Sequence, residues 1–135
     1  MPAVFVDTNV FLRHLVQDNA DQSPRASAFL QRLERGEVEA ETSQLVVAEV
    51  IFTLERTYKT PKSEVRRLLL DVMALRGLAL PGSPTIQDAL DLYVQENVSY
   101  GDAFNAVEMA RRGLTTVVSF DHDFDRVPWL TRIEP

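Results

Sequence analysis

Apolar residues recur along this chain with two periods, one typical of strands and one typical of amphipathic helices. Short apolar runs predict strands at residues 4–6, 38–41, 78–80 and 115–120, with a last edge strand at 131–134. Between these runs, apolar positions spaced three and four residues apart predict helices. The predicted helices cover residues 8–16, 26–33, 44–58, 65–75, 84–94 and 100–112. Strands and helices therefore alternate along the sequence.

Alternation of this kind predicts an α/β domain, with parallel strands joined by right-handed crossovers. The 135 residues suffice for one such domain, and no repeat, linker or low-complexity segment interrupts them, so we expect residues 1–135 to form a single domain. In parallel sheets, ligands bind beyond the carboxyl ends of the strands. Asp7 follows the first predicted strand and Asp121 follows the clearest later one, so both lie where a site is expected.

Composition limits the environment and the partners of the protein. The chain has no cysteine, which excludes disulfides and thiolate metal sites and fits a reducing intracellular compartment. No apolar run reaches the length of a membrane span, and the short run before Asp7 is not a signal peptide, so we expect a cytoplasmic protein with no membrane partner. The net charge of −6 argues against binding nucleic acid through a broad basic face.

Four acidic residues each end or interrupt an apolar run, where packing alone does not explain a carboxylate. They are Asp7 in V-F-V-D-T-N, Glu49 in V-V-A-E-V-I-F, Asp102 in Y-G-D-A-F-N-A and Asp121 in V-V-S-F-D-H-D-F. Carboxylates that lie close together repel one another, and a bound cation relieves that repulsion. Oxygen ligands without cysteine or paired histidine favour the hard cations Mg²⁺ and Mn²⁺. If the fold brings the four acids together, they form a site that can activate a phosphoryl group and a water.

Two of these acids also have simpler explanations as structural residues. Asp7 precedes a predicted helix and could cap its N-terminus. Ser99 and Asp102 match a capping box, in which the acid bonds back to the serine amide. Asn105, however, lies one helical turn after Asp102, and a carboxylate beside an amide suits a site for a metal and water.

Glu49 and Asp121 also have alternative explanations, as a buried ion pair and as part of a polar loop. The predicted helix around Glu49 is apolar on all sides, which predicts a buried carboxylate whose charge needs either a metal or a buried arginine. Asp121 opens the run Asp-His-Asp-Phe-Asp, which is more commonly a polar loop. Within that run Asp123 is either a helper of the site or a solvent residue. His122, like His14, lacks the spacing of a metal ligand.

The four segments, in this order, resemble the motifs of PIN-domain ribonucleases, and most of all those of the small VapC-type toxins of bacterial and archaeal toxin–antitoxin pairs. V-F-V-D-T-N-V-F-L-R-H-L resembles the first motif, and Glu49 in V-V-A-E-V-I-F-T-L matches the second acid. Asp102 in Y-G-D-A-F-N-A-V matches the third acid, and Asp121 in V-V-S-F-D-H-D-F matches the fourth. The resemblance covers nearly the whole chain, including Ser119, where the family has serine or threonine.

This resemblance implies a three-layer α/β/α domain with a short, mainly parallel central sheet. It implies an endoribonuclease that hydrolyses RNA phosphodiester bonds with Mg²⁺ or Mn²⁺. Asp7, Asp102 and Asp121 would hold the metal, and Glu49 would hold it or orient the attacking water. Neighbouring polar residues would keep these carboxylates in place, namely Thr8, Asn9 and Ser119. Family members of this type form homodimers, and a segment of the cognate antitoxin blocks the acidic groove.

The positions of Asn105 and Arg13 make them two further candidate residues of the site. Asn105 is added because it neighbours Asp102 on the same helical face. Arg13 lies close behind Asp7, and an acidic site must still hold an anionic substrate, so Arg13 is a candidate contact for RNA phosphate.

Two other classes of function compete with the ribonuclease. Another Mg²⁺-dependent phosphoryl hydrolase, such as an aspartyl phosphatase of the haloacid dehalogenase class, needs D-x-D after the first strand, where this chain has Asn9. A non-catalytic module is the second rival. A phosphoryl-accepting receiver needs a lysine late in the chain, and none follows Lys62. A PIN-like module that only binds RNA or protein does not need all four acids.

Overall fold

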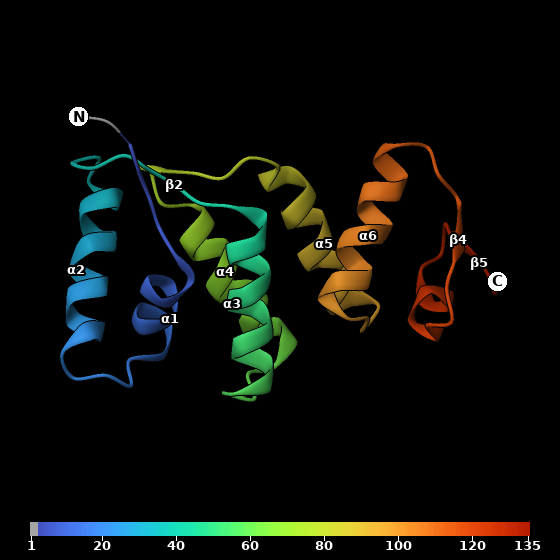
Figure 1. Ribbon diagram of the computed structural model, residues 1–135, viewed down its shortest axis with the longest axis horizontal. Coiled ribbons are helices and arrows are strands. Elements are labelled where there is room, and N and C mark those ends of the chain that lie inside the picture. Colours follow the sequence, from blue (N-terminus) through green and yellow to red (C-terminus); the bar gives the residue numbers. More distant parts are fainter. Residues whose placement is uncertain (1–2) are drawn as a thin grey trace. The chain divides into compact units, whose positions relative to one another are not determined.

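The computed structural model describes residues 3–135, which form two compact units, one that ends at Gly82 and one that covers Ser83–Pro135 (Figure 1). The strands of the first unit are β1 (Val4–Phe5), β2 (Ala40–Glu41) and β3 (Leu78–Ala79), in the spatial order β1-β2-β3. Its helices are α1 (Thr8–Val16), α2 (Gln22–Glu34), α3 (Gln44–Arg56) and α4 (Lys62–Met73). Two helices therefore separate each strand of this sheet from the next.

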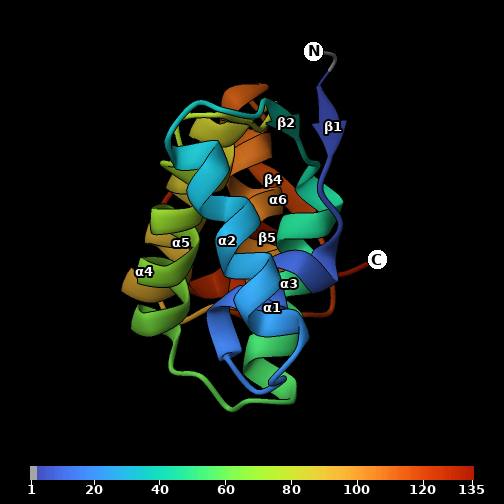
Figure 2. The ribbon, with the colours of Figure 1, turned by 90° about the vertical axis from the view of Figure 1, so that its left-hand side faces the viewer.

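The sheet of the first unit is parallel, as the alternation of elements predicts. Val4 of β1 lies opposite Ala40 of β2, and Ala40 lies opposite Leu78 of β3. The pairing of β1 with β2 is visible in Figure 2. Because the strands run in one direction, their carboxyl ends lie at one edge of the sheet, where β1 leads through Val6 to Asp7.

Helix packing forms the core of the first unit. α1 packs against α2 and α3, and α3 packs against α4. Each helix contributes buried apolar side chains, such as Phe11 of α1, Leu30 of α2, Ile51 of α3 and Leu69 of α4. The i, i+3, i+4 spacing of the sequence gathers these side chains on one side of each helix, and their burial stabilises the unit.

A close backbone approach determines where β3 begins. Gly77 donates its N–H to the Leu33 carbonyl at 2.9 Å, and its own carbonyl accepts the Ala40 N–H at 2.8 Å. A Cβ at Gly77 would overlap the carbonyl oxygens of Leu33 and Val38. Only glycine therefore fits between these backbone segments. Gly77 lies outside the preceding helix, α4, which ends at Met73.

The second unit holds α5 (Ser83–Gln95), α6 (Tyr100–Arg111), β4 (Thr116–Val118), the 3-10 helix η1 (His122–Arg126) and β5 (Thr131–Ile133). α5 packs against α6, and the ring of Tyr93 meets that of Tyr100 edge-on with centroids 6.2 Å apart. β4 and β5 are parallel, with Val118 opposite Ile133. η1 contacts both β5 and α6, so it joins the two-stranded sheet to the helices of this unit.

The predicted α/β class is confirmed, and the strand pairs within residues 3–135 are parallel. The predicted helices are present, with ends that differ by a few residues, whereas η1 was not predicted. The strand predicted at 115–120 ends at Val118, because Ser119 Oγ accepts the Asp121 N–H at 2.9 Å and turns the chain towards η1. The single domain expected over residues 1–135 stays a prediction. No helix in the described part of the chain is long and apolar enough to cross a membrane.

Candidate metal centre

The start of α6 is held by Ser99, as the sequence predicts. The Ser99 hydroxyl accepts the Asp102 N–H at 3.1 Å, which is an N-cap bond. The return bond of a capping box is made by a different acid, because the Ser99 N–H donates to Asp123 Oδ2 at 3.0 Å. Oδ2 of Asp102 is buried and has no hydrogen-bond partner within residues 3–135. The backbone of Asp102 therefore takes part in the cap, whereas its carboxylate does not accept the return bond of a capping box.

Asp121 is held where the chain passes from β4 into η1. Its N–H donates to Ser119 Oγ at 2.9 Å. Its Oδ1 accepts the Asp123 N–H at 2.9 Å and so caps the first turn of η1. Ser119 thus contacts the fourth predicted acid through the Asp121 amide.

Three acids of the second unit converge on one point. Asp102, Asp121 and Asp123 each offer one carboxylate oxygen, and these oxygens all lie within 4.8 Å of one another. They come from the first turn of α6, from the turn after β4 and from η1. Asp123, for which the sequence left both a functional and a solvent role open, belongs to this cluster and also bonds to Ser99.

The surroundings of the cluster shift the pKa values of Asp102 and Asp121 in opposite directions. Burial raises the pKa of Asp102 to about 6, and the carboxylate of Asp121 beside it adds to the rise. The Asp123 N–H, followed by the Asp102 carboxyl, holds the pKa of Asp121 below its ordinary value. Two carboxyls whose pKa values are driven apart in this way titrate as a pair. The cluster concentrates negative charge that a cation would neutralise.

The donor set fits a hard divalent cation. The three side chains offer carboxylate oxygens only, which Mg²⁺ and Mn²⁺ prefer to nitrogen or sulfur. The buried, unpartnered Oδ2 of Asp102 also fits a cation ligand, because buried polar atoms of folded proteins almost always have a partner.

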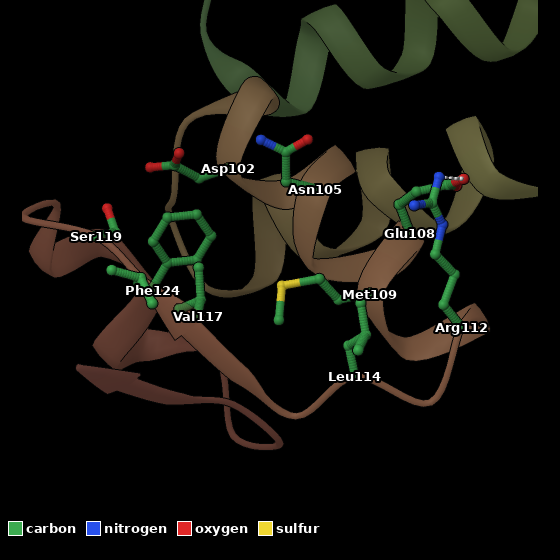
Figure 3. A pocket seen from close by; sticks show the side chains of 10 residues that line it. Asp102, Asn105, Glu108, Met109, Arg112, Leu114, Val117, Ser119 and Phe124 are labelled. Carbon is green, nitrogen blue, oxygen red and sulfur yellow. Dashed lines mark hydrogen bonds and ion pairs between the residues drawn. The ribbon is translucent and has the colours of Figure 1, made fainter. Parts of the chain in front are cut away.

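An open hollow of about 500 Å³ lies beside Asp102, between α6 and the segment from β4 to η1 (Figure 3). Asp102 and Ser119 lie at one end of the hollow, Glu108 and Arg112 lie at the other, and Asn105 lies between them. The floor between these polar ends is mainly apolar and includes Met109, Leu114, Val117 and Phe124. Asn105 therefore shares a face with Asp102, as its helical spacing predicts.

The remaining predicted acids lie in the first unit. Asp7 occupies the N-cap position of α1, but its exposed side chain makes no capping hydrogen bond. Thr8, the next residue, donates its hydroxyl to Glu49 Oε2 at 2.6 Å and so connects α1 to α3. Asn9 is exposed on α1 one residue further on.

The prediction that Glu49 is buried is wrong. Glu49 is exposed, and the apolar Leu45 one turn earlier is 68% exposed as well. The buried stripe of α3 consists of Val46, Val47, Val50, Ile51 and Leu54. A helix with apolar residues on every side can still leave one side open, because burial depends on what packs against it. The Glu49 charge therefore needs no buried arginine, and its carboxylate is accessible.

Comparison with known proteins identifies the family of the chain. A family profile described as PIN domain matches residues 4–130, a span that contains Asp7, Glu49, Asp102 and Asp121. The chain belongs to the PIN domain family. The predicted α/β/α PIN-like fold class is the fold class of this family.

Two individual proteins are similar to this PIN domain. A VapC ribonuclease of Aquifex aeolicus (strain VF5) is 22% identical over 126 residues, which are 93% of this chain and 93% of that protein. The crystal structure of Mycobacterium tuberculosis VapC20, described as a sarcin-ricin loop cleaving toxin, is 20% identical. That match covers 98% of this chain and 100% of the other, with a TM-score of 0.37.

The predicted substrate contact of this PIN domain, Arg13, is held by neighbours in the first unit. Its Nε donates to Gln22 Oε1 at 2.7 Å, and its NH1 lies 3.4 Å from Asp18 Oδ1. Its side chain is one-third exposed, and with Asn9 it lines an open hollow of about 450 Å³. Any role of Arg13 in binding RNA stays a prediction.

Sequence reasoning missed one residue beside the acid cluster of the PIN domain. Arg132 of β5 donates to the Ser119 carbonyl and to the Asp125 carboxylate. No local pattern marks it, because a single arginine in a short edge strand is normally a solvent residue.

Proposed function

We propose that this PIN domain is a metal-dependent endoribonuclease that hydrolyses RNA phosphodiester bonds, and that it acts as the toxin of a toxin–antitoxin pair. The observation that carries the proposal is the convergence of Asp102, Asp121 and Asp123 around a buried carboxylate oxygen without a partner. Family membership and the similarity to a VapC ribonuclease support the same reaction.

The proposed cofactor is Mg²⁺ or Mn²⁺, held by Asp102 and Asp121 with Asp123 beside them. When bound, such an ion polarises a phosphoryl oxygen and lowers the pKa of a water. The protein supplies the position of the carboxylates. Ser99 holds the first turn of α6, which carries Asp102, and Ser119 holds the amide of Asp121.

We propose that Asp7 and Glu49 act in the same site, and that residues 1–135 work as one domain. Support comes from the family match, which runs through both compact units without a break. Thr8 supports the role of Glu49, because a hydroxyl bond at 2.6 Å limits the rotamers open to that carboxylate. Asn9 lies beside Thr8 in the chain, and Asn105 faces the hollow beside Asp102.

The proposed partners follow from the same assignment. RNA is the substrate, and Arg13 is the candidate contact for its phosphates. A cognate antitoxin would inhibit the protein by blocking the acidic site, and the functional form would be a homodimer. The cysteine-free sequence is consistent with action in the cytoplasm.

The test is cleavage of pooled cellular RNA with Mg²⁺ or Mn²⁺, and with EDTA, by the native chain and by Asp102→Asn. A matched control is Asp88→Asn, which removes a surface aspartate of the same unit that pairs with Arg111 at 2.9 Å. We expect discrete fragments from the native chain and from the control, only with metal, and none from Asp102→Asn.

Two results would contradict the proposal. Equal cleavage by Asp102→Asn would show that the acid cluster is not the active site. The absence of metal-dependent cleavage at high protein concentration, together with intact Mn²⁺ binding, would favour a non-catalytic binding module. The ends of the fragments would identify the RNA and the sequence that is cut.

A further inference from the structure

Three arginines of the second unit form ion pairs with carboxylates, namely Arg111, Arg112 and Arg132. Arg132 has the least exposed side chain of the three, at 11%. Its Nε donates to Asp125 Oδ1 at 2.9 Å, and its NH1 donates to the Ser119 carbonyl at 3.0 Å. Further contacts reach Glu134 Oε1 at 3.2 Å and His122 Nδ1 at 3.0 Å. The Arg132 guanidinium thus bonds both to Ser119, which precedes η1, and to Asp125 within η1.

These contacts lie on both sides of Asp121. Ser119 precedes Asp121 by two residues, and its hydroxyl accepts the Asp121 N–H. Asp125 lies in η1, which begins directly after Asp121 and is capped by the Asp121 carboxylate through the Asp123 N–H. The Ser119 N–H also donates to the Ile133 carbonyl at 3.0 Å, so β5 holds Ser119 at both of its backbone polar groups.

We propose that Arg132 is a positioning residue of the acid cluster: by bonding Ser119 and Asp125 together, it determines where the Asp121 carboxylate lies relative to Asp102. This proposal rests on the proposed function, in which Asp121 is a metal ligand. Arg132 donates no hydrogen bond to the cluster oxygens within residues 3–135. It bonds to the chain on either side of Asp121, and its positive charge also acts on Asp121 over a longer distance.

The chemistry of arginine suits this role. Asp125 accepts from Nε at 2.9 Å and, more weakly, from NH2 at 3.4 Å, while NH1 remains available to the Ser119 carbonyl. A planar fork can satisfy several acceptors at fixed angles, whereas a lysine ammonium presents a single compact charge. An exposed ion pair contributes little to stability, but this guanidinium is enclosed and bonds a backbone carbonyl, so its loss leaves that carbonyl without its donor.

The experiment compares Arg132→Met, Arg132→Lys and Arg111→Met with the native chain. Arg111→Met is the matched control, because it removes an arginine of the same unit that pairs with Asp88 away from the cluster. The first measurement is amide hydrogen exchange of the metal-free proteins. We expect the Asp121 and Asp123 amides to exchange faster in Arg132→Met, while buried amides of α5 and α6 keep their native rates.

The second measurement is Mn²⁺ affinity by calorimetry, followed by RNA cleavage. Loss of a residue that orients a ligand lowers metal affinity or activity by about 10–100-fold, and we expect a loss of this size in Arg132→Met. Arg132→Lys should fall between Arg132→Met and the native chain, and Arg111→Met should match the native chain.

Unchanged exchange at Asp121 together with unchanged Mn²⁺ affinity in Arg132→Met would overturn the proposal. Faster exchange throughout the second unit would also overturn it, because Arg132 would then only stabilise the fold. If Arg132→Met does not fold, Arg132→Lys is judged by the same criteria. If the native chain neither binds Mn²⁺ nor cuts RNA, the proposed function fails, while the exchange rates still decide whether Arg132 positions Asp121.

Discussion

The Ser99 N–H donates to the Asp123 carboxylate at 3.0 Å, in the place that a capping box would give to Asp102. The Ser99 hydroxyl still caps α6 through the Asp102 N–H. The acid at the third position of α6 is thereby released from the structural role that its spacing predicts. Asp102 keeps a buried oxygen without a partner, and this favours a metal ligand over a helix cap.

Replacing Asp102 with Asn should stabilise the metal-free protein at neutral pH. The folded-state pKa of Asp102 is about 6, above its ordinary value of 3.8, so the folded state holds this proton more tightly than the unfolded chain does. The contribution is fully present below about pH 4 and is lost as the pH rises through about 6. We expect Asp102→Asn to raise the free energy of unfolding by about 1 kcal/mol, a figure already reduced for partial solvent screening.

Thermal unfolding in EDTA at pH 5 and pH 8 measures this effect, and the gain should be larger at pH 8. Ser99→Ala is the contrasting variant, because it removes the hydroxyl cap of α6 and should cost about 1 kcal/mol of stability. A loss of stability in Asp102→Asn would instead assign its carboxylate to the helix cap.

Mn²⁺ affinity should fall as the pH drops through about 6. A cation and a proton compete for the Asp102 carboxylate, whose pKa is about 6, so affinity should drop by about tenfold per pH unit below that value. Calorimetric titrations between pH 5 and pH 8 test this, and Asp102→Asn should bind weakly with little dependence on pH in this range. Native affinity that stays constant over the range would mean that Asp102 does not bind the ion.

The Thr8 hydroxyl should matter for activity more than for folding. Thr8→Val keeps the shape of the side chain but removes its bond to Glu49, and we expect RNA cleavage to fall by about 10–100-fold. Thr8→Ser retains the hydroxyl and should stay near the native rate. Equal rates in both variants and the native chain would exclude Thr8 from the orientation of Glu49.

Asp123 combines two roles that substitution can separate. Asp123→Asn keeps an oxygen that can accept the Ser99 N–H but loses the negative charge, so Mn²⁺ affinity should fall while the melting temperature stays close to native. Asp123→Ala loses both roles and should also cost about 0.5–1.5 kcal/mol of stability for the lost hydrogen bond. Native Mn²⁺ affinity in Asp123→Asn would restrict Asp123 to its bond with Ser99.

Local features of this protein follow from its sequence alone. Helix positions and the Ser99 cap depend on residue spacing and on side chains within a few positions of one another. The four motif acids belong to this group as well, because order and local context identify them. Asp102 and Asn105 share a helical face for the same reason.

Other features were decided by tertiary structure. Glu49 is exposed because packing covers only one side of an apolar helix, and no sequence period states which side that is. Asp123 accepts the Ser99 N–H across 24 residues, and Arg132 reaches Ser119 across 13. Such bonds form only where strands and helices place distant groups within hydrogen-bond reach. The sequence by itself therefore determined the four candidate acids, and the fold decided which other groups lie beside them.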